Sequence, residues 1–184
     1  VPVTVDALVP LVAMPDETVR LALNELTDKG LVRLEARQAS CRSMVAANSL
    51  ARQMGDPERF HKRVVQAMVR SPEPDLVRLG WHLVGAGDTR RIQSRGPGIL
   101  ELAVVRDGRE AARLADEMWA LTPYPALVAP RMRALAAAGR APEARSLGED
   151  FMGRRPPLAE DVPVLVELAR LYVDYGSHDD LALG

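Results

Sequence analysis

Two segments in the second half of the chain repeat one pattern, and this repetition limits the possible folds more than any other feature. Residues 102–115 and 135–147 each read as an apolar helix, a turn at a glycine, and a second helix that opens with Glu-Ala. The two turn glycines, Gly108 and Gly139, are 31 residues apart. Repeats of this length build stacked pairs of helices that share a continuous core. The sequence therefore predicts an array of helices.

Weaker copies of the pattern occupy residues 83–88 and 168–177, and residues 93–98, which contain glycine and proline, are predicted to interrupt the array as a loop. The spacing resembles that of tetratricopeptide repeats, whose period is about 34 residues. We expect about three tetratricopeptide-like helix pairs, the last one incomplete. The last helix is predicted to bury one apolar stripe, formed by Val162, Leu165, Leu168, Ala169, Tyr172 and Tyr175.

The first part of the chain begins with two helical patterns of different strength. A short apolar helix is expected over residues 4–13, where Pro10 must kink it or shift its start. An amphipathic helix follows over residues 16–29, with acidic residues in its first turn and Gly30 just past its end. The short connection between them predicts two packed helices.

After these helices the apolar period shifts towards two, which is typical of strands. Two short strands, 31–35 and 41–45, enclose a polar tip, and residues 46–54 return to a helical pattern. This order resembles a winged helix-turn-helix that lacks its first helix. We therefore expect a mostly helical chain in three parts. These are a winged-helix domain over 1–54, a connecting helix or linker over 55–74, and tetratricopeptide-like helical repeats over 75–184.

Together the two halves resemble a region of STAND-type signal-transduction ATPases, including large LuxR-family regulators and actinobacterial antibiotic regulatory proteins. The resemblance rests on residues 22–32, at the end of the amphipathic helix, and on residues 79–88, which look like the opening of the helical sensor arm. In this family the winged helix packs on an upstream nucleotide-binding domain, and the repeats take a protein partner or a small-molecule effector. The resemblance implies a cytoplasmic regulatory fragment of a multidomain transcriptional regulator, which can form homo-oligomers.

Several activities are not expected of this chain itself. It has no Gly-x-x-x-x-Gly-Lys-Ser/Thr loop, so we expect no ATPase activity and no cofactor here, and any ATPase module lies outside it. The family's nucleotide-sensing histidine has no counterpart in residues 42–45. Cys41 is the single cysteine, and the three histidines are far apart, so neither a metal site nor a catalytic group is predicted. No apolar run is long enough to span a membrane.

DNA reading by the winged helix is the alternative function. The side chains that would carry it are Arg20, Asn24, Arg33, Arg37 and Arg42. Against it, the whole chain has a net charge of −1, and residues 16–29 carry four acidic but only two basic side chains. We therefore favour a structural or regulatory role for the winged helix, with DNA as a possible partner only in the alternative.

The candidate groove of the helical repeats is defined by aromatic residues. Its expected lining residues are Trp81, His82, Trp119, Tyr124 and Tyr172. The competing interpretation is that these side chains fill gaps between helices, and that His82 is a packed helix residue. Two basic clusters could contact an acidic partner or remain solvated: Arg90, Arg91 and Arg95, and Arg154 with Arg155.

Overall fold

The structure is a computed structural model and describes residues 3–12, 14–36, 38–43, 55–154 and 156–175. The chain divides into two compact units, Val1–Pro74 and Asp75–Gly184. It is mostly helical with one small antiparallel sheet, which confirms the expected fold class at this level. Within the described ranges, no helix is both long enough and apolar enough to cross a lipid bilayer.

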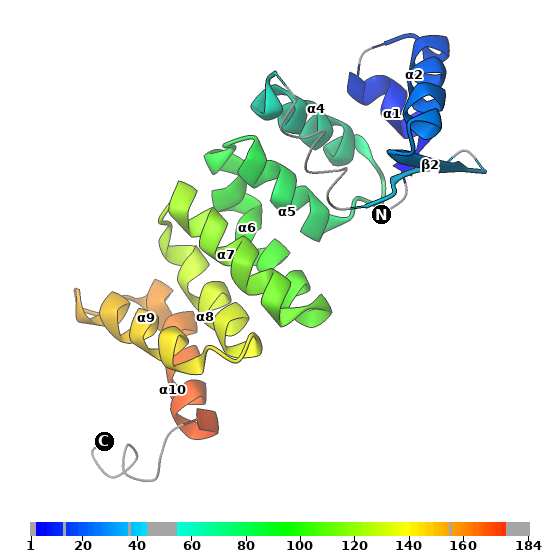
Figure 1. The fold of residues 1–184 in the computed structure, drawn as a ribbon. Helices are drawn as coiled ribbons and strands as arrows, with labels where there is room; N and C mark the ends of the chain where they lie inside the picture. The colour runs from blue at the N-terminus through cyan, green and yellow to red at the C-terminus, as the bar shows by residue number, and fades with distance from the viewer. Residues whose placement is uncertain (1–2, 13, 37, 44–54, 155, 176–184) are drawn as a thin grey trace. The chain divides into compact units, whose positions relative to one another are not determined.

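The first unit combines short helices with a small sheet (Figure 1). Its described elements are β1 (Val3–Thr4), α1 (Val5–Val12), α2 (Asp16–Asp28), β2 (Val32–Glu35), β3 (Gln38–Cys41) and α4 (Pro57–Arg70). β3 lies between β1 and β2 and is antiparallel to both. α1 contacts both α2 and α4. The apolar side chains of α1, α2 and the sheet therefore meet in one small core, which contains Val5, Val19, Leu23, Val32 and Ala39.

The hairpin is tighter than the sequence predicts. The second strand begins at Gln38, not at Cys41, because the turn is made at Ala36, whose φ of 43° lies in the left-handed region. Most of the predicted polar tip is therefore strand. β1 is an addition that the sequence analysis missed, since Thr4 was assigned to the first helix and Val3 to no element. The helical pattern predicted for residues 46–54 lies outside the described residues.

Both predicted helices of this unit are present. α1 spans Val5–Val12 and includes Pro10, so the helix neither stops before the proline nor starts after it. α2 ends in a Schellman-type turn, in which the Gly30 N–H bonds to the Thr27 carbonyl at 2.9 Å and the Leu31 N–H bonds to the Leu26 carbonyl at 2.9 Å. The φ of Gly30 is +70°, a conformation that glycine adopts without steric cost.

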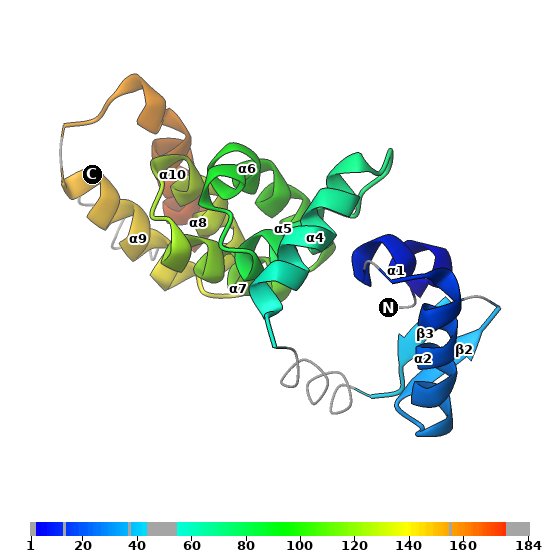
Figure 2. The same ribbon diagram turned by 90° about the horizontal axis from the view of Figure 1, so that it is seen from above.

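The second unit is an array of six described helices (Figures 1 and 2). They are α5 (Leu76–Gly85), α6 (Thr89–Arg106), α7 (Gly108–Leu121), α8 (Val128–Ala137), α9 (Ala141–Gly153) and α10 (Val162–Tyr175). Two short 3₁₀ turns, η1 (Pro125–Leu127) and η2 (Ala159–Asp161), precede α8 and α10. Each helix packs on the next one, and α8 also packs on both α6 and α10. The array therefore builds its core from neighbouring helices.

Residues 93–98 do not form the predicted loop. They lie inside α6, which continues through Pro97. A proline inside a helix removes one backbone hydrogen bond, but this helix buries Ile92, Ile99 and Leu100 at helical spacing. Gly96 supports the same packing, because an added Cβ would lie only 3.0 Å from a Leu127 methyl carbon. Burial of one apolar face thus outweighs the local signals of glycine and proline.

The turn glycines fall into two conformational types. Gly87 after α5 and Gly139 after α8 have φ values of +60° and +80°, and both close a Schellman-type turn. Gly108 instead opens α7, where an added Cβ would lie 2.5 Å from the carbonyl oxygen of Ala137. The two glycines that mark the sequence repeat therefore serve different purposes: Gly139 permits a left-handed turn, and Gly108 permits close approach.

The apolar stripe predicted for α10 is wrong in register. Val162, Leu165 and Tyr175 are exposed, whereas Val164 and Leu171 are buried. The buried face of α10 also contains Glu167. Leu168 is partly buried and packs against the core cluster that includes Met132 and Ala144. The sequence analysis placed the helix by its apolar residues alone and missed the buried carboxylate that forms an ion pair with α8.

Candidate interaction surfaces

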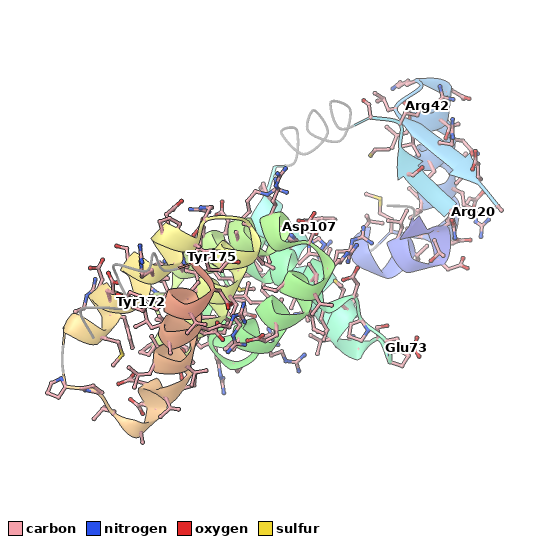
Figure 3. All side chains as sticks on the ribbon, turned by 90° about the horizontal axis from the view of Figure 1, so that it is seen from below. Arg20, Arg42, Glu73, Asp107, Tyr172 and Tyr175 are labelled. Atoms are coloured by element: carbon pink, nitrogen blue, oxygen red, sulfur yellow. The ribbon has the colours of Figure 1, made fainter. Side chains whose placement is uncertain are left out.

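Two of the basic side chains proposed for DNA contact, Arg20 and Arg33, are already paired within the first unit. Arg20 donates to Asp16 on the same helix at 2.7 Å, and Arg33 lies 3.6 Å from Glu35 on β2. Asn24 is exposed on α2, and Arg42 is exposed just after β3. Figure 3 shows Arg20 and Arg42 at separate places on this unit. Arg37 lies outside the described residues.

The exposed surface of α2 carries more negative than positive charge. Asp16, Glu17, Glu25 and Asp28 lie on the helix with one cation, Arg20. The hydrogen bond from Lys29, at 2.5 Å, lowers the pKa of Glu25 and keeps this carboxylate charged. A phosphate backbone would be repelled by these groups and would compete for cations already bound to carboxylates.

The five residues proposed for one groove lie at several different places in the second unit. Trp81 on α5 donates its indole N–H to Glu110 on α7 at 3.2 Å, and its neighbour His82 is half-buried. Tyr172 on α10 donates its hydroxyl to Glu149 on α9, beneath the guanidinium of Arg145. Trp81 and Tyr172 therefore join helices, which corresponds to the gap-filling interpretation.

Of the five residues, Trp119 lines an accessible hollow, and Tyr124 lies in sequence between two prolines that also line it. The Arg131 guanidinium lies over the Trp119 ring at 5.3 Å from the ring centroid, so one face of the indole is covered. Tyr124 is exposed just before η1. A pocket of about 290 Å³ is lined by Trp119, Pro123, Pro125, Phe151 and Arg154. Sequence analysis named Trp119 and Arg154 separately, but it missed Phe151 and the two prolines.

Three ionised side chains connect alternate helices of the array. Arg133 on α8 bonds to Glu101 on α6 and, at 2.6 Å, to Glu167 on α10. Burial alone would lower the pKa of Arg133, but hydrogen bonds with Glu167 and Glu101 outweigh it and raise the pKa. We call these residues the Glu101–Arg133–Glu167 triad. It compensates the charge of the buried Glu167 carboxylate and orients three helices at once.

A second charged network joins α7 to α8 and to the turn before α9. Asp116 accepts hydrogen bonds from Arg131, at 2.9 Å, and from Arg140, at 3.1 Å. Arg140 also forms a two-bond pair with Glu143, which lowers the pKa of that carboxyl group. The hydrogen bonds to Asp116 hold the Arg131 guanidinium over the Trp119 ring, and Trp119 lines the pocket.

The remaining candidate residues lie at different places in the described part of the chain. In the described part of the chain, no three His, Cys, Asp or Glu side chains are grouped so that they could hold a metal ion. Cys41 is an exposed thiol at the end of β3. In the basic cluster on α6, Arg91 pairs with Asp88, and Arg90 and Arg95 are exposed. A second hollow, of about 440 Å³, lies in the first unit beside Met14, Phe60 and Arg63.

Comparison with known proteins gives no assignment. No model of a protein family matches the chain, and no match is found among curated proteins or among solved structures.

Proposed function

We propose that this chain is a regulatory and interaction module of a cytoplasmic, multidomain transcriptional regulator of the STAND type. Its second unit is a tetratricopeptide-like array that binds a protein partner or a small-molecule effector. Its first unit is a winged helix that receives this signal and contacts an upstream nucleotide-binding domain. The chain acts by binding, and the ATP chemistry of such regulators belongs to a different domain.

The spacing of the Glu101–Arg133–Glu167 triad carries this proposal. The hydrogen bonds join residues separated by 32 and by 34 positions, on α6, α8 and α10. The sequence separation between equivalent positions of successive helix pairs is therefore close to the period of tetratricopeptide repeats, which is about 34 residues. Stacked pairs of this kind expose extended surfaces that are suited to binding.

The element order in the first unit supports the second part of the proposal. Two helices are followed by an antiparallel hairpin, and a short strand preceding α1 adds to the same sheet. The acidic α2 lies where a DNA-reading winged helix would present cations to phosphates. A regulatory protein contact explains this charge better than duplex binding does.

Thermal unfolding of the purified chain tests the proposal. The candidates added are the nucleotide-binding domain expected upstream in the parent protein and a library of small organic effectors. A partner at 100 times its Kd stabilises the folded state by about 2.7 kcal/mol, which is measurable as a rise in Tm. If neither the domain nor any effector shifts the Tm, the proposed binding function is wrong.

Duplex DNA is included as a separate binding partner in this test. If the first unit reads DNA, its affinity for duplex DNA must fall steeply as the salt concentration rises, and it must also fall when Arg42 is replaced by alanine. Arg109→Ala is a matched control, because Arg109 is an exposed arginine of the second unit. Salt-dependent binding that only Arg42→Ala reduces would favour the DNA-binding alternative over the regulatory one.

A further inference from the structure

The pocket beside α7 and α9 has rigid apolar walls. Trp119 and Phe151 contribute aromatic rings from two helices, and Pro123 and Pro125 contribute ring carbons from the segment between α7 and α8. Both aromatic residues also pack against the buried core of the second unit. The rings are therefore held in place before any ligand arrives, so little side-chain entropy would be lost on binding.

Among the described residues that line this pocket, Arg154 is the one that carries a charge. Arg131, which covers the Trp119 ring, is neutralised by two hydrogen bonds to Asp116. Arg154 lines the pocket at the C-terminal end of α9, and no ion pair joins it to another residue of the described chain. A guanidinium recognises a planar carboxylate through paired hydrogen bonds.

We propose that this pocket binds a small aromatic carboxylate. The ring would lie between Trp119, Phe151 and the two prolines, and the carboxylate would bind Arg154. A volume of about 290 Å³ is near the lower limit for small-molecule sites, so it suits a one- or two-ring acid rather than a macrocycle. This inference rests on the proposed binding function and names the ligand class and the site.

The test is an NMR titration of the ¹⁵N-labelled chain with 2-naphthylacetate. The signals followed are those of the tryptophan indole N–H groups. The chain has two tryptophans, and Trp81→Phe assigns the signals. We expect the Trp119 signal to shift with a Kd of about 1 mM or lower, as is typical of a ligand of this size. The Trp81 signal should stay in place, because Trp81 is bonded to Glu110 and does not line the pocket.

One variant tests the charge of Arg154, and a control variant and a neutral ligand analogue accompany it. Arg154→Gln should weaken binding about tenfold or more, because it removes a charge-assisted hydrogen bond. Arg109→Gln, an exposed arginine outside the pocket, should leave the Kd unchanged. The neutral analogue 2-naphthylacetamide should bind as weakly as the acid binds to Arg154→Gln.

The outcomes separate this inference from the function on which it rests. If the Trp119 signal does not move, or the acid and the amide bind equally, the aromatic-carboxylate site is wrong. If another effector or the partner domain still raises the Tm, the proposed function stands without this site. If only a peptide with a C-terminal phenylalanine shifts the Trp119 signal, a protein end replaces the small acid as the occupant.

Discussion

The two units differ in how completely they exclude water from their cores. In the first unit, the core cluster between α1, α2 and the sheet comprises five buried side chains among the described residues, and Leu23 retains 8% of its surface exposed. In the second unit Leu114, Leu100 and Leu83 are each 0% exposed. A small core gains less from apolar burial per residue of ordered backbone than an extended one. The comparison indicates a rigid array and a first unit that a binding partner could reshape at lower cost.

A matched pair of leucine truncations tests this difference most strongly. Leu114→Ala should reduce the free energy of unfolding of the second unit by about 4 kcal/mol, and Leu23→Ala that of the first by about 2 kcal/mol. The chemistry is the same, so the ratio reports burial and packing. Hydrogen exchange of peptides from α7 and α2 measures each loss in its own unit. Equal losses would show that the two cores are equally well packed.

The Glu101–Arg133–Glu167 triad gives the next largest expected effect. Arg133→Ala leaves the carboxylate of Glu167 buried without its strongest partner, and should cost about 2 kcal/mol of unfolding free energy. Arg20→Ala removes a comparable hydrogen bond, but its pair with Asp16 is solvent-exposed, so no measurable loss is expected. Urea denaturation of both variants checks this contrast. A negligible loss for Arg133→Ala would refute the role assigned to the triad.

The failures of sequence-based prediction have a common physical cause. The helices and their approximate bounds follow from apolar spacing, because that spacing reflects local geometry. The loop predicted at residues 93–98 and the stripe predicted for α10 failed because tertiary partners decide them. Leu127 and Met118 hold Gly96 in place, and Arg133 requires Glu167 to face inward.

The pocket could be predicted only in part, for the same reason. Trp119 and Arg154 stand out in the sequence, but 35 positions separate them. Their meeting depends on how α7, the proline-containing segment and α9 stack. A single sequence contains no local signal for that contact, whereas the helix ends are specified by neighbouring residues.

Glycine substitutions distinguish close approach from turn conformation. Gly139→Ala places a side chain at a φ of +80° and should cost about 1 kcal/mol. Gly108→Ala should cost about 2 kcal/mol or more, because its Cβ would meet the backbone of Ala137 and force α7 away from α8. Gly30→Ala is the corresponding turn variant of the first unit and should match Gly139→Ala. If thermal unfolding shows a larger loss of stability for Gly139→Ala than for Gly108→Ala, this explanation is wrong.

The smallest expected effect is the pH dependence of the helix caps. Asp107 accepts hydrogen bonds from the backbone N–H groups of Glu110 and Arg109, and these bonds lower its pKa. A lowered folded-state pKa adds stability above the unfolded-state pKa, and this stability is lost as the pH falls through the folded-state value. Asp107→Asn keeps a capping side chain without a charge. The variant should therefore be less stable than the wild type at neutral pH, and the difference should shrink as the pH falls through the lowered folded-state pKa of Asp107.

Asp56→Asn supplies the matched variant in the first unit, since Asp56 caps α4 through one backbone bond, from Arg59 at 2.9 Å. Asp107 accepts two backbone hydrogen bonds and Asp56 accepts one, so the loss of stability at neutral pH should be larger for Asp107→Asn. Unfolding at about pH 7 compares the two variants, and unfolding followed down to about pH 2 measures the pH dependence of Asp107→Asn. If the Asp107→Asn difference persists unchanged in acid, the variant has altered the cap geometry and the charge of Asp107 does not stabilise α7.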